Sequence, residues 1–471
     1  TISCTTKNMS LPRILVSAAH KSSGKTTISI GLCAALRKSG YSVQSFKKGP
    51  DYIDPIWLKH ATGKPCYNLD FYTSDRDEIL QTISDQGESA DISVIEGNKG
   101  LYDGLDLDGS NSNAALATLT ESPVILVIDA RGMTRGIAPL ILGYQQFDPD
   151  IDIAAVILNK VGGTRHESKL VKVIEHYTDV PVIGAVHRSS DLHLPERHLG
   201  LKPSNEFAGV ASIIERIGER VGSEVELDQL MNIARSSQPL NIAQTISPID
   251  TSAPSLRLGI ARDAAFNFYY QNDLDAFAAQ GVELVEFDTL EDTSLPARLN
   301  GLFIGGGFPE TQMQALSANT SLLQQIRAAI EAGMPVYAEC GGLMYLSRSL
   351  LWNDDKASMV GAIQADTVMH TAPQGRGYVR MEKTADWPWG GPDTGRDVIN
   401  AHEFHYSSLE NLEITDGFGY RVLRGTGIDG EYDGIVYKNL FACYTHQRNT
   451  RQNQWVRQFT DFIRANPGPW T

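Results

Sequence analysis

The sequence predicts an α/β protein made of two successive domains, each built on a doubly wound and mostly parallel sheet. Three observations support this prediction. Short apolar runs alternate with amphipathic stretches along most of the chain, which is typical of repeated strand–helix–strand units. A stretch rich in proline, serine and threonine, residues 244–255, interrupts this alternation. The length of 471 residues is sufficient for two or three domains.

Residues 12–243 are predicted to form the first domain. Several of its apolar runs have no polar alternation, as expected for parallel strands that are buried on both faces. Helices are predicted over Thr26–Lys38 and Met133–Gln145. The predicted strands are Ile14–Ser17, Ser42–Phe46, Ile92–Glu96, Val124–Asp129, Ala154–Asn159 and Val182–Ala185. Ligands are expected at the carboxyl ends of these strands.

Residues 256–471 are predicted to form the second domain, with residues 244–255 as the linker between the two. The alternation of apolar runs and amphipathic stretches resumes at the end of the linker. The predicted strands are Leu256–Ala261, Val282–Phe287, Gly301–Ile304 and Pro335–Ala338.

Composition excludes several classes of function. The net charge of −15 argues against a nucleic-acid partner, because phosphates require a basic surface. No apolar run is long enough to cross a bilayer, so no membrane partner is expected. The five cysteines are an odd number without paired spacing, and no signal peptide precedes them. These features favour free thiols and a cytoplasmic location.

The first candidate site follows the strand predicted at Ile14–Ser17. The run Ala19–Thr27 (AHKSSGKTT) has the order of a phosphate-binding loop, with Gly24, Lys25, Thr26 and Thr27 entering a helix. Such a loop needs converging backbone N–H groups, a lysine for the terminal phosphate and a hydroxyl for Mg²⁺. Ala19 replaces the usual first glycine, and a serine-rich loop that only mimics the motif is the alternative. The surrounding strand and helix favour a P-loop.

Charged and amide side chains follow three other strands of this region. The pair Asp51 and Asp54, next to Lys47 and Lys48, suits a Mg²⁺–triphosphate site, although a charged surface turn would have the same spacing. Glu96 ends a strand, where a metal-binding carboxylate belongs. Asn159 ends another strand and could bind an adenine edge, or could simply terminate the strand. The predicted Mg²⁺ ligands are Thr26, Asp51 and Glu96, and Lys48 and Asn159 are predicted to contact ATP.

The second candidate site contains a cysteine at a strand-to-helix turn. Cys340 follows the apolar run before it and precedes two glycines, and His446 comes about a hundred residues later. A cysteine nucleophile needs a base and an oxyanion hole, which His446 and the backbone of Gly305–Gly307 could supply. The alternative is that Cys340 is a small buried hydrophobic residue, as most cysteines are.

Several motifs together resemble the cobyrinic acid a,c-diamide synthase family over nearly the whole chain. They are the P-loop, Lys48–Pro55 (KGPDYIDP), Glu96–Gly104 (EGNKGLYDG) and Leu194–Leu201 (LPERHLGL). The resemblance implies amidation of acetate side chains on a tetrapyrrole polycarboxylic acid, with ATP, Mg²⁺ and glutamine. It also implies that Asp51, Asp54 and Glu96 act in nucleotide binding and acid activation.

Two neighbouring segments of this chain depart from that family. The family usually has two apolar residues where this chain has Asn98-Lys99, and residues 108–113 (DGSNSN) are also polar. This departure resembles a branch that is thought to amidate sirohaem. The acceptor is therefore expected to be either cobyrinic acid or sirohaem.

The second half resembles a class I glutamine amidotransferase domain of the cobyric-acid-synthase type. The resemblance rests on Gly305–Glu310 (GGGFPE), Glu339–Met344 (ECGGLM) and Thr445-His446. It implies that Cys340 attacks glutamine and that His446 is the base. Class I members usually have a glutamate two residues after the histidine, but Arg448 occupies this position. A Cys–His dyad is therefore expected.

Two other functions remain as alternatives at this point. A ligase like dethiobiotin synthetase would use the P-loop without needing Cys340. A non-enzymatic switch would use ATP to drive dimerisation, and a homodimer is also possible for the amidating enzyme. The sequence of the second half favours the amidating enzyme over both.

Overall fold

The computed structural model describes residues 6–197, 200–206, 209–243, 255–390, 398–413 and 416–468. Its contacts divide the chain into two compact units, Thr1–Ile246 and Ser247–Thr471. Of the predicted linker, residues 244–254 lie outside the described residues, as do His198 and Leu199 of the family motif. None of the helices in the described ranges is both long and apolar enough to cross a membrane.

Unit 1 is built on a seven-stranded sheet in the order β4-β3-β5-β2-β6-β7-β8, and every neighbouring pair is parallel. All six predicted strands are present, and the sequence analysis missed the short β4. The strands are β2 (Arg13–Ala18), β3 (Val43–Lys48), β4 (Tyr67–Leu69), β5 (Ile92–Glu96), β6 (Val124–Asp129), β7 (Ile153–Val161) and β8 (Val182–His187).

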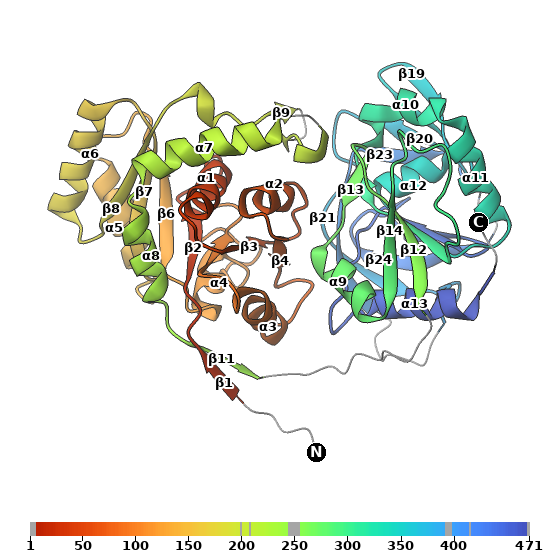
Figure 1. Ribbon diagram of the computed structural model, residues 1–471, viewed down its shortest axis with the longest axis horizontal. Coiled ribbons are helices and arrows are strands. Elements are labelled where there is room, and N and C mark those ends of the chain that lie inside the picture. The colour runs from red at the N-terminus through yellow and green to blue at the C-terminus, as the bar shows by residue number, and fades with distance from the viewer. Residues whose placement is uncertain are drawn as a thin grey trace. The chain divides into compact units, whose positions relative to one another are not determined.

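Helices cover both faces of this sheet (Figure 1), so the doubly wound prediction is confirmed. Ile14, Val16 and Ala18 of β2 belong to one core, while Leu15 between them belongs to the other, as strand geometry requires. The first face packs against α1 (Lys25–Lys38), α2 (Ile53–Thr62), α7 (Val210–Glu224) and α8 (Leu227–Arg235). The second packs against α3 (Arg76–Gly87), α4 (Asn113–Leu119), α5 (Ile137–Phe147) and α6 (Thr164–Tyr177).

One predicted helix begins later than expected. The prediction placed its start at Met133, whereas α5 starts at Ile137. Gly132 has a φ of +70°, and Gly136 stands at the helix N-cap, so the intervening residues form a turn. The remaining elements of unit 1 are short: β1 (Thr6–Met9) paired with β11 (Leu240–Ala243), β9 (Glu196–Arg197) paired with β10 (Gly200–Leu201), and the 3₁₀ turns Ser190–Leu192 and Ser204–Glu206.

Unit 2 contains a nine-stranded sheet in the order β14-β12-β15-β17-β26-β25-β24-β21-β22. The first five strands are parallel, and the last four extend the sheet by antiparallel pairing. The parallel strands are β12 (Leu256–Ala261), β14 (Val282–Phe287), β15 (Gly301–Ile304), β17 (Val336–Glu339) and β26 (Leu440–Cys443). The antiparallel strands are β21 (Gly375–Lys383), β22 (Val398–His405), β24 (Phe418–Arg424) and β25 (Tyr432–Tyr437).

Two cores enclose this sheet as well. One lies against α9 (Gln271–Ala279) and α13 (Trp455–Ala465). The other lies against α10 (Met313–Ala318), α11 (Thr320–Glu331) and α12 (Gly341–Leu346). The second core also includes a four-stranded sheet made of β18 (Ser347–Trp352), β19 (Asp355–Ser358), β20 (Ile363–Met369) and β23 (Ser407–Glu410). The unit also contains two short strands that pair in antiparallel orientation, β13 (Phe266–Phe268) and β16 (Gly306–Gly307). The 3₁₀ turn Pro309–Gln312 follows β16.

Candidate functional sites

The predicted phosphate-binding loop lies between the end of β2 at Ala18 and the start of α1 at Lys25. Gly24, at the N-cap of α1, has a φ of +89°, and a Cβ there would lie 2.2 Å from Asn159 Nδ2. Glycine is therefore required for both conformation and space. The first N–H groups of a helix have no partner within the helix, and they attract anions. The local geometry fits a phosphate at this end of α1.

The end of strand β7 holds this loop in place. Asn159 Nδ2 donates a hydrogen bond to the carbonyl of Ser23 (2.8 Å), and Lys160 Nζ donates one to the carbonyl of Ser22 (2.8 Å). Lys160 also forms an ion pair with Asp129 at the end of β6 (3.0 Å). Asn159 was predicted to contact the nucleotide, and the structure adds that its amide supports the loop.

Three of the predicted residues meet beside the loop. The hydroxyl of Thr26, in the first turn of α1, donates to Glu96 Oε1 at 2.8 Å, and Asp54 Oδ2 lies 3.2 Å from it. Glu96 ends β5 and is fully buried, and its second oxygen, Oε2, has no hydrogen-bond partner among the residues that the structure describes. A buried carboxylate oxygen without a partner is costly unless a ligand satisfies it.

Lys47 joins this group; of the two lysines that precede the aspartates, only Lys48 was predicted to contact ATP. Its Nζ contacts Asp54 Oδ2 at 2.5 Å and Glu96 Oε1 at 3.0 Å, and all three side chains are almost completely buried. Burial alone would lower the pKa of Lys47, but the two carboxylates raise it above its usual value. Burial raises the pKa of Glu96 to about 7, against the opposing effect of Lys47. Lys47 is therefore a fixed cation beside the phosphate loop.

Mg²⁺ fits these residues. A hydroxyl at the helix N-terminus and a carboxylate with an unsatisfied oxygen are the protein ligands that Mg²⁺ commonly uses with phosphate oxygens and water. Among the described residues, no three His, Cys, Asp or Glu side chains form a cage for a metal. Asp51, the third predicted ligand, uses its Oδ1 to accept from the N–H groups of Ile53 and Asp54 in the first turn of α2 (2.9 and 3.0 Å).

Lys48, also predicted to contact ATP, makes different contacts from its neighbour Lys47. Its Nζ donates to the carbonyl of Asn111 at 2.7 Å and lies 3.3 Å from the side-chain oxygens of Asn98 and Asn111. Burial lowers the pKa of Lys48 to about 8. The lysine thus connects the two polar segments in which this chain departs from the family pattern.

A pocket of about 640 Å³ lies beside the loop. Gly24, Thr27 and Asn159 line it together with residues that follow β6 and β8, which puts it at the carboxyl ends of the strands. Its remaining lining residues are Arg131, Lys160, His187, Arg188, Ser189, Ser190, Leu192 and His193. The pocket is a suitable place for the nucleoside of a bound nucleotide.

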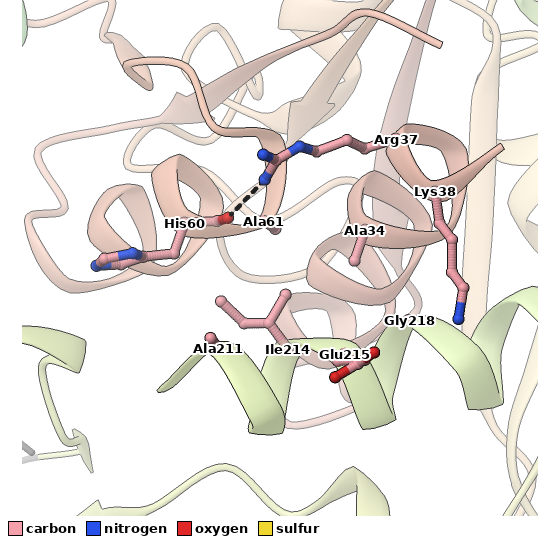
Figure 2. A pocket seen from close by; sticks show the side chains of 9 residues that line it. All are labelled: Ala34, Arg37, Lys38, His60, Ala61, Ala211, Ile214, Glu215 and Gly218. Carbon is pink, nitrogen blue, oxygen red and sulfur yellow. Dashed lines mark hydrogen bonds between the residues drawn. The ribbon is translucent and has the colours of Figure 1, made fainter. Parts of the chain in front are cut away.

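Figure 2 shows a second, smaller pocket of about 410 Å³ between α1, α2 and α7. Arg37, at the edge of the pocket, donates to the carbonyl of His60 at 3.4 Å. None of the predicted site residues lines this pocket. We assign it no role.

Cys340 occupies a strained turn between β17 and α12. Its φ of +47° and ψ of −101° are unusual for a residue with a side chain, and such strain is found at functional sites. Its thiol donates to the carbonyl of Phe404 at 3.8 Å. Burial raises the pKa of the thiol, and Glu310 raises it further. The resting cysteine therefore keeps its proton.

Glycines surround this turn closely. A Cβ on Gly342 would lie 2.1 Å from the carbonyl oxygen of Ile304, and one on Gly341 would lie 2.9 Å from the amide nitrogen of Gly307. A Cβ on Gly306 would lie 2.5 Å from Cε1 of His446. The glycine segment after β15 is therefore packed between the cysteine turn and the imidazole, where its N–H groups could bind an oxyanion.

His446 follows β26, the strand that pairs with β17 so that Cys443 lies opposite Glu339. Its backbone N–H donates to the carbonyl of His402 (2.8 Å). Burial, together with the neighbouring His405, lowers the pKa of the ring to about 3. Sequence reasoning missed one neighbour of the ring: Glu339 Oε2 lies 3.4 Å from His446 Nδ1.

Comparisons with known proteins agree with both predicted domain types. Residues 14–201 match the CobQ/CobB/MinD/ParA nucleotide binding domain family, and residues 257–454 match the CobB/CobQ-like glutamine amidotransferase domain family. The cobyrinate a,c-diamide synthase of Magnetococcus marinus is 42% identical and covers 96% of this chain and 97% of its own length. That of Methanosarcina acetivorans is 41% identical, with 93% and 92% covered. That of Listeria innocua is 40% identical, with 92% and 95% covered.

Both predicted domain types and the family resemblance are thereby confirmed, and two alternatives lose their support. A ligase without a glutaminase and a non-enzymatic switch would both leave the second domain unused. The chain belongs to the cobyrinate a,c-diamide synthase family and is a glutamine-dependent ligase.

Proposed function

We propose that this enzyme uses ATP and glutamine to amidate the peripheral a and c acetate groups of cobyrinate. The observation that carries the proposal is similarity over almost the full length, across both domains, to relatives named for this reaction. We further propose that it acts in the cytoplasm as a homodimer.

In unit 1, a substrate carboxylate attacks the terminal phosphorus of ATP, which releases ADP and leaves an acyl phosphate. Phosphoryl transfer depends mainly on positioning and on neutralisation of charge. Lys25 and the loop N–H groups bind the phosphates, and Lys47 holds Asp54 and Glu96 in place. Mg²⁺, held by Thr26 and Glu96, would neutralise charge on the transferred group.

In unit 2, Cys340 releases ammonia from the side-chain amide of glutamine. His446 takes the thiol proton while the sulfur attacks the γ-amide carbon of glutamine, and the C–N bond breaks as His446 returns the proton to the leaving nitrogen. Water hydrolyses the thioester to glutamate. The ammonia displaces phosphate from the acyl phosphate to give the amide.

The acceptor has a second candidate, sirohaem, because of one local feature. Asn98 stands where the family usually has an apolar residue. Its side chain contacts Lys48, which also donates a hydrogen bond to Asn111. This polar contact distinguishes the chain from the pattern that the corrin amidases share.

The test incubates the pure protein with Mg²⁺-ATP, glutamine and either cobyrinic acid or sirohaem, and identifies the products by mass spectrometry. Conversion of cobyrinic acid to the diamide supports the proposal. Conversion of sirohaem alone assigns the enzyme to sirohaem and makes the polar contact a selecting feature. Glutamine hydrolysis with neither product contradicts both acceptors.

Replacing the nucleophile separates the two half-reactions. Cys340→Ala is expected to abolish glutamine use and to retain amidation with ammonium salts. The matched control is Cys443→Ala, which removes a buried thiol from the adjacent strand and should keep glutaminase activity. Loss of amidation with both nitrogen donors in Cys340→Ala would contradict this division of labour.

A further inference from the structure

The third member of a class I triad is absent from its usual position. Arg448 stands there, and its guanidinium contacts Asn272 (3.4 Å) and lies over the ring of Tyr270. A cation cannot accept the Nδ1 proton of a histidine. If His446 has an orienting partner, that partner must come from another part of the fold.

Glu339 is in the right place for this role. It immediately precedes Cys340, and its Oε2 lies 3.4 Å from His446 Nδ1, with both side chains about 3% to 4% exposed. Its other oxygen, Oε1, accepts from the hydroxyl of Tyr337 (2.7 Å) and from the backbone N–H of Gln447 (2.8 Å). These two bonds fix the carboxyl group against the residue that follows the histidine.

We infer that Glu339 is the positioning residue of the glutaminase, and that it holds His446 in the tautomer that can accept the thiol proton. The inference rests on the proposed roles of Cys340 and His446. The strand that leads into the nucleophile thus supplies the carboxylate that class I enzymes usually place after the histidine.

The proton positions follow from the hydrogen bonds. Because Oε1 already accepts two donors, a proton on this carboxyl group must lie on Oε2, which faces Nδ1. When Oε2 is protonated it donates to Nδ1, and the ring proton must then lie on Nε2. When Glu339 is ionised, Nδ1 carries the proton, and the unprotonated Nε2 can take the proton of Cys340. Only the ionised form of Glu339 supports catalysis.

The surroundings of Glu339 set the pH at which this form appears. Burial raises the pKa of Glu339 to about 8, although the bonds from Tyr337 and Gln447 lower it. Since the ionised form is the active one, glutaminase activity should rise with pH and level off above about 8. Other titratable groups from the surrounding elements act on this cluster: Asp273, Glu310, His405, Asp433 and Cys443.

The central test is Glu339→Gln, which keeps the size of the side chain and removes its charge. We expect the kcat for glutamine hydrolysis to fall by about 10²–10⁴-fold with little change in KM, and the rise with pH to disappear. Amidation with ammonium salts should be unchanged. Glu339→Asp keeps the carboxylate and should retain a rise with pH at reduced kcat.

Tyr337→Phe provides a second, independent test. It removes a hydrogen bond from the same buried carboxyl group at the oxygen that faces away from His446. Because that bond lowers the pKa of Glu339, its loss should move the rise of activity to higher pH while the plateau is kept. This shift tests the inference even if Glu339→Gln does not fold.

Three outcomes overturn different statements. If Cys340→Ala abolishes glutaminase activity while Glu339→Gln retains wild-type kcat and pH profile, the positioning role is wrong and the proposed function stands. An unshifted pH profile in Tyr337→Phe also contradicts the role of Glu339. If Cys340→Ala still hydrolyses glutamine, the proposed function itself fails.

Discussion

The two candidate sites treat buried charge in opposite ways. In unit 1, the buried Lys47 lies between Asp54 and Glu96, so opposite charges are already paired beside the phosphate loop. In unit 2, no lysine or arginine of the described residues forms an ion pair with Glu339, and burial shifts the pKa values of Cys340, His446 and Glu339 toward their neutral forms.

This difference matches the two chemistries. A site that receives a triphosphate must present fixed charge before the ligand arrives, because reorganising charge during the reaction would raise the barrier. A buried thiol that stays protonated avoids an uncompensated anion and is less reactive while glutamine is absent. The glutaminase site therefore depends on a proton transfer in which His446 is held correctly.

The largest expected effect concerns the cation of the loop itself. Lys25→Ala should lower amidation about 10³-fold or more with either glutamine or ammonium salts, because the terminal phosphate loses its closest cation. Product formation measured by mass spectrometry, together with ADP release, checks this expectation. The control is Lys21→Ala, which removes an exposed lysine from the same loop. Equal effects of the two substitutions would show that the loop contributes only general positive charge.

The second prediction tests the paired charge directly. Lys47→Met should lower the free energy of unfolding by about 3–5 kcal/mol, because two buried carboxylates lose their shared partner. Urea unfolding at constant pH, followed by circular dichroism, measures this loss in the transition that corresponds to unit 1. Glu96→Gln in the same chain should recover part of it, since one of the stranded charges is then removed.

The neighbouring residue provides the control for that measurement. Lys48→Met removes a lysine from the same strand whose hydrogen bonds go to uncharged amide and carbonyl oxygens. Its effect should be smaller, about 1 kcal/mol. If both variants are destabilised equally, the charge pairing inferred for Lys47 is wrong.

The contrast between Lys47 and Lys48 also shows what the sequence could predict. The phosphate loop, the strands of unit 1 and the cysteine turn have local signals: glycines at fixed positions and apolar runs before them. Both lysines were predicted to lie beside the two aspartates, but only Lys48 was predicted to contact ATP. Because every residue of β3 is buried, its pattern of polarity does not reveal which side chain faces which side of the sheet.

The parts that were missed in unit 2 have a related cause. The antiparallel strands β21, β22, β24 and β25 were not predicted; β25 pairs with its neighbours in the chain, β24 and β26, whereas the pairing of β21 with β24 joins segments that are distant in sequence. The contact of Glu339 with His446 arises from the register between β17 and β26. A single sequence does not contain that register, whereas it does contain the motif that places Glu339 beside the nucleophile.

The smallest expected effect concerns Asp51, whose carboxylate accepts two N–H groups of α2. Asp51→Ala should lower stability by about 0.5–2 kcal/mol through loss of this cap, whereas Asp51→Asn keeps a capping oxygen and should leave stability unchanged. Thermal unfolding separates the two variants.

The same pair of variants then tests whether Asp51 also contributes charge to the nucleotide site. Asp51→Asn removes the charge alone, and if the predicted metal-binding role is correct it should reduce amidation with both nitrogen donors. Turnover equal to wild type with ammonium salts would leave Asp51 as a helix cap only. In that case Thr26, Asp54 and Glu96 would remain as the candidate metal ligands, and the charge pairing around Lys47 would be sufficient to hold the two carboxylates beside the loop.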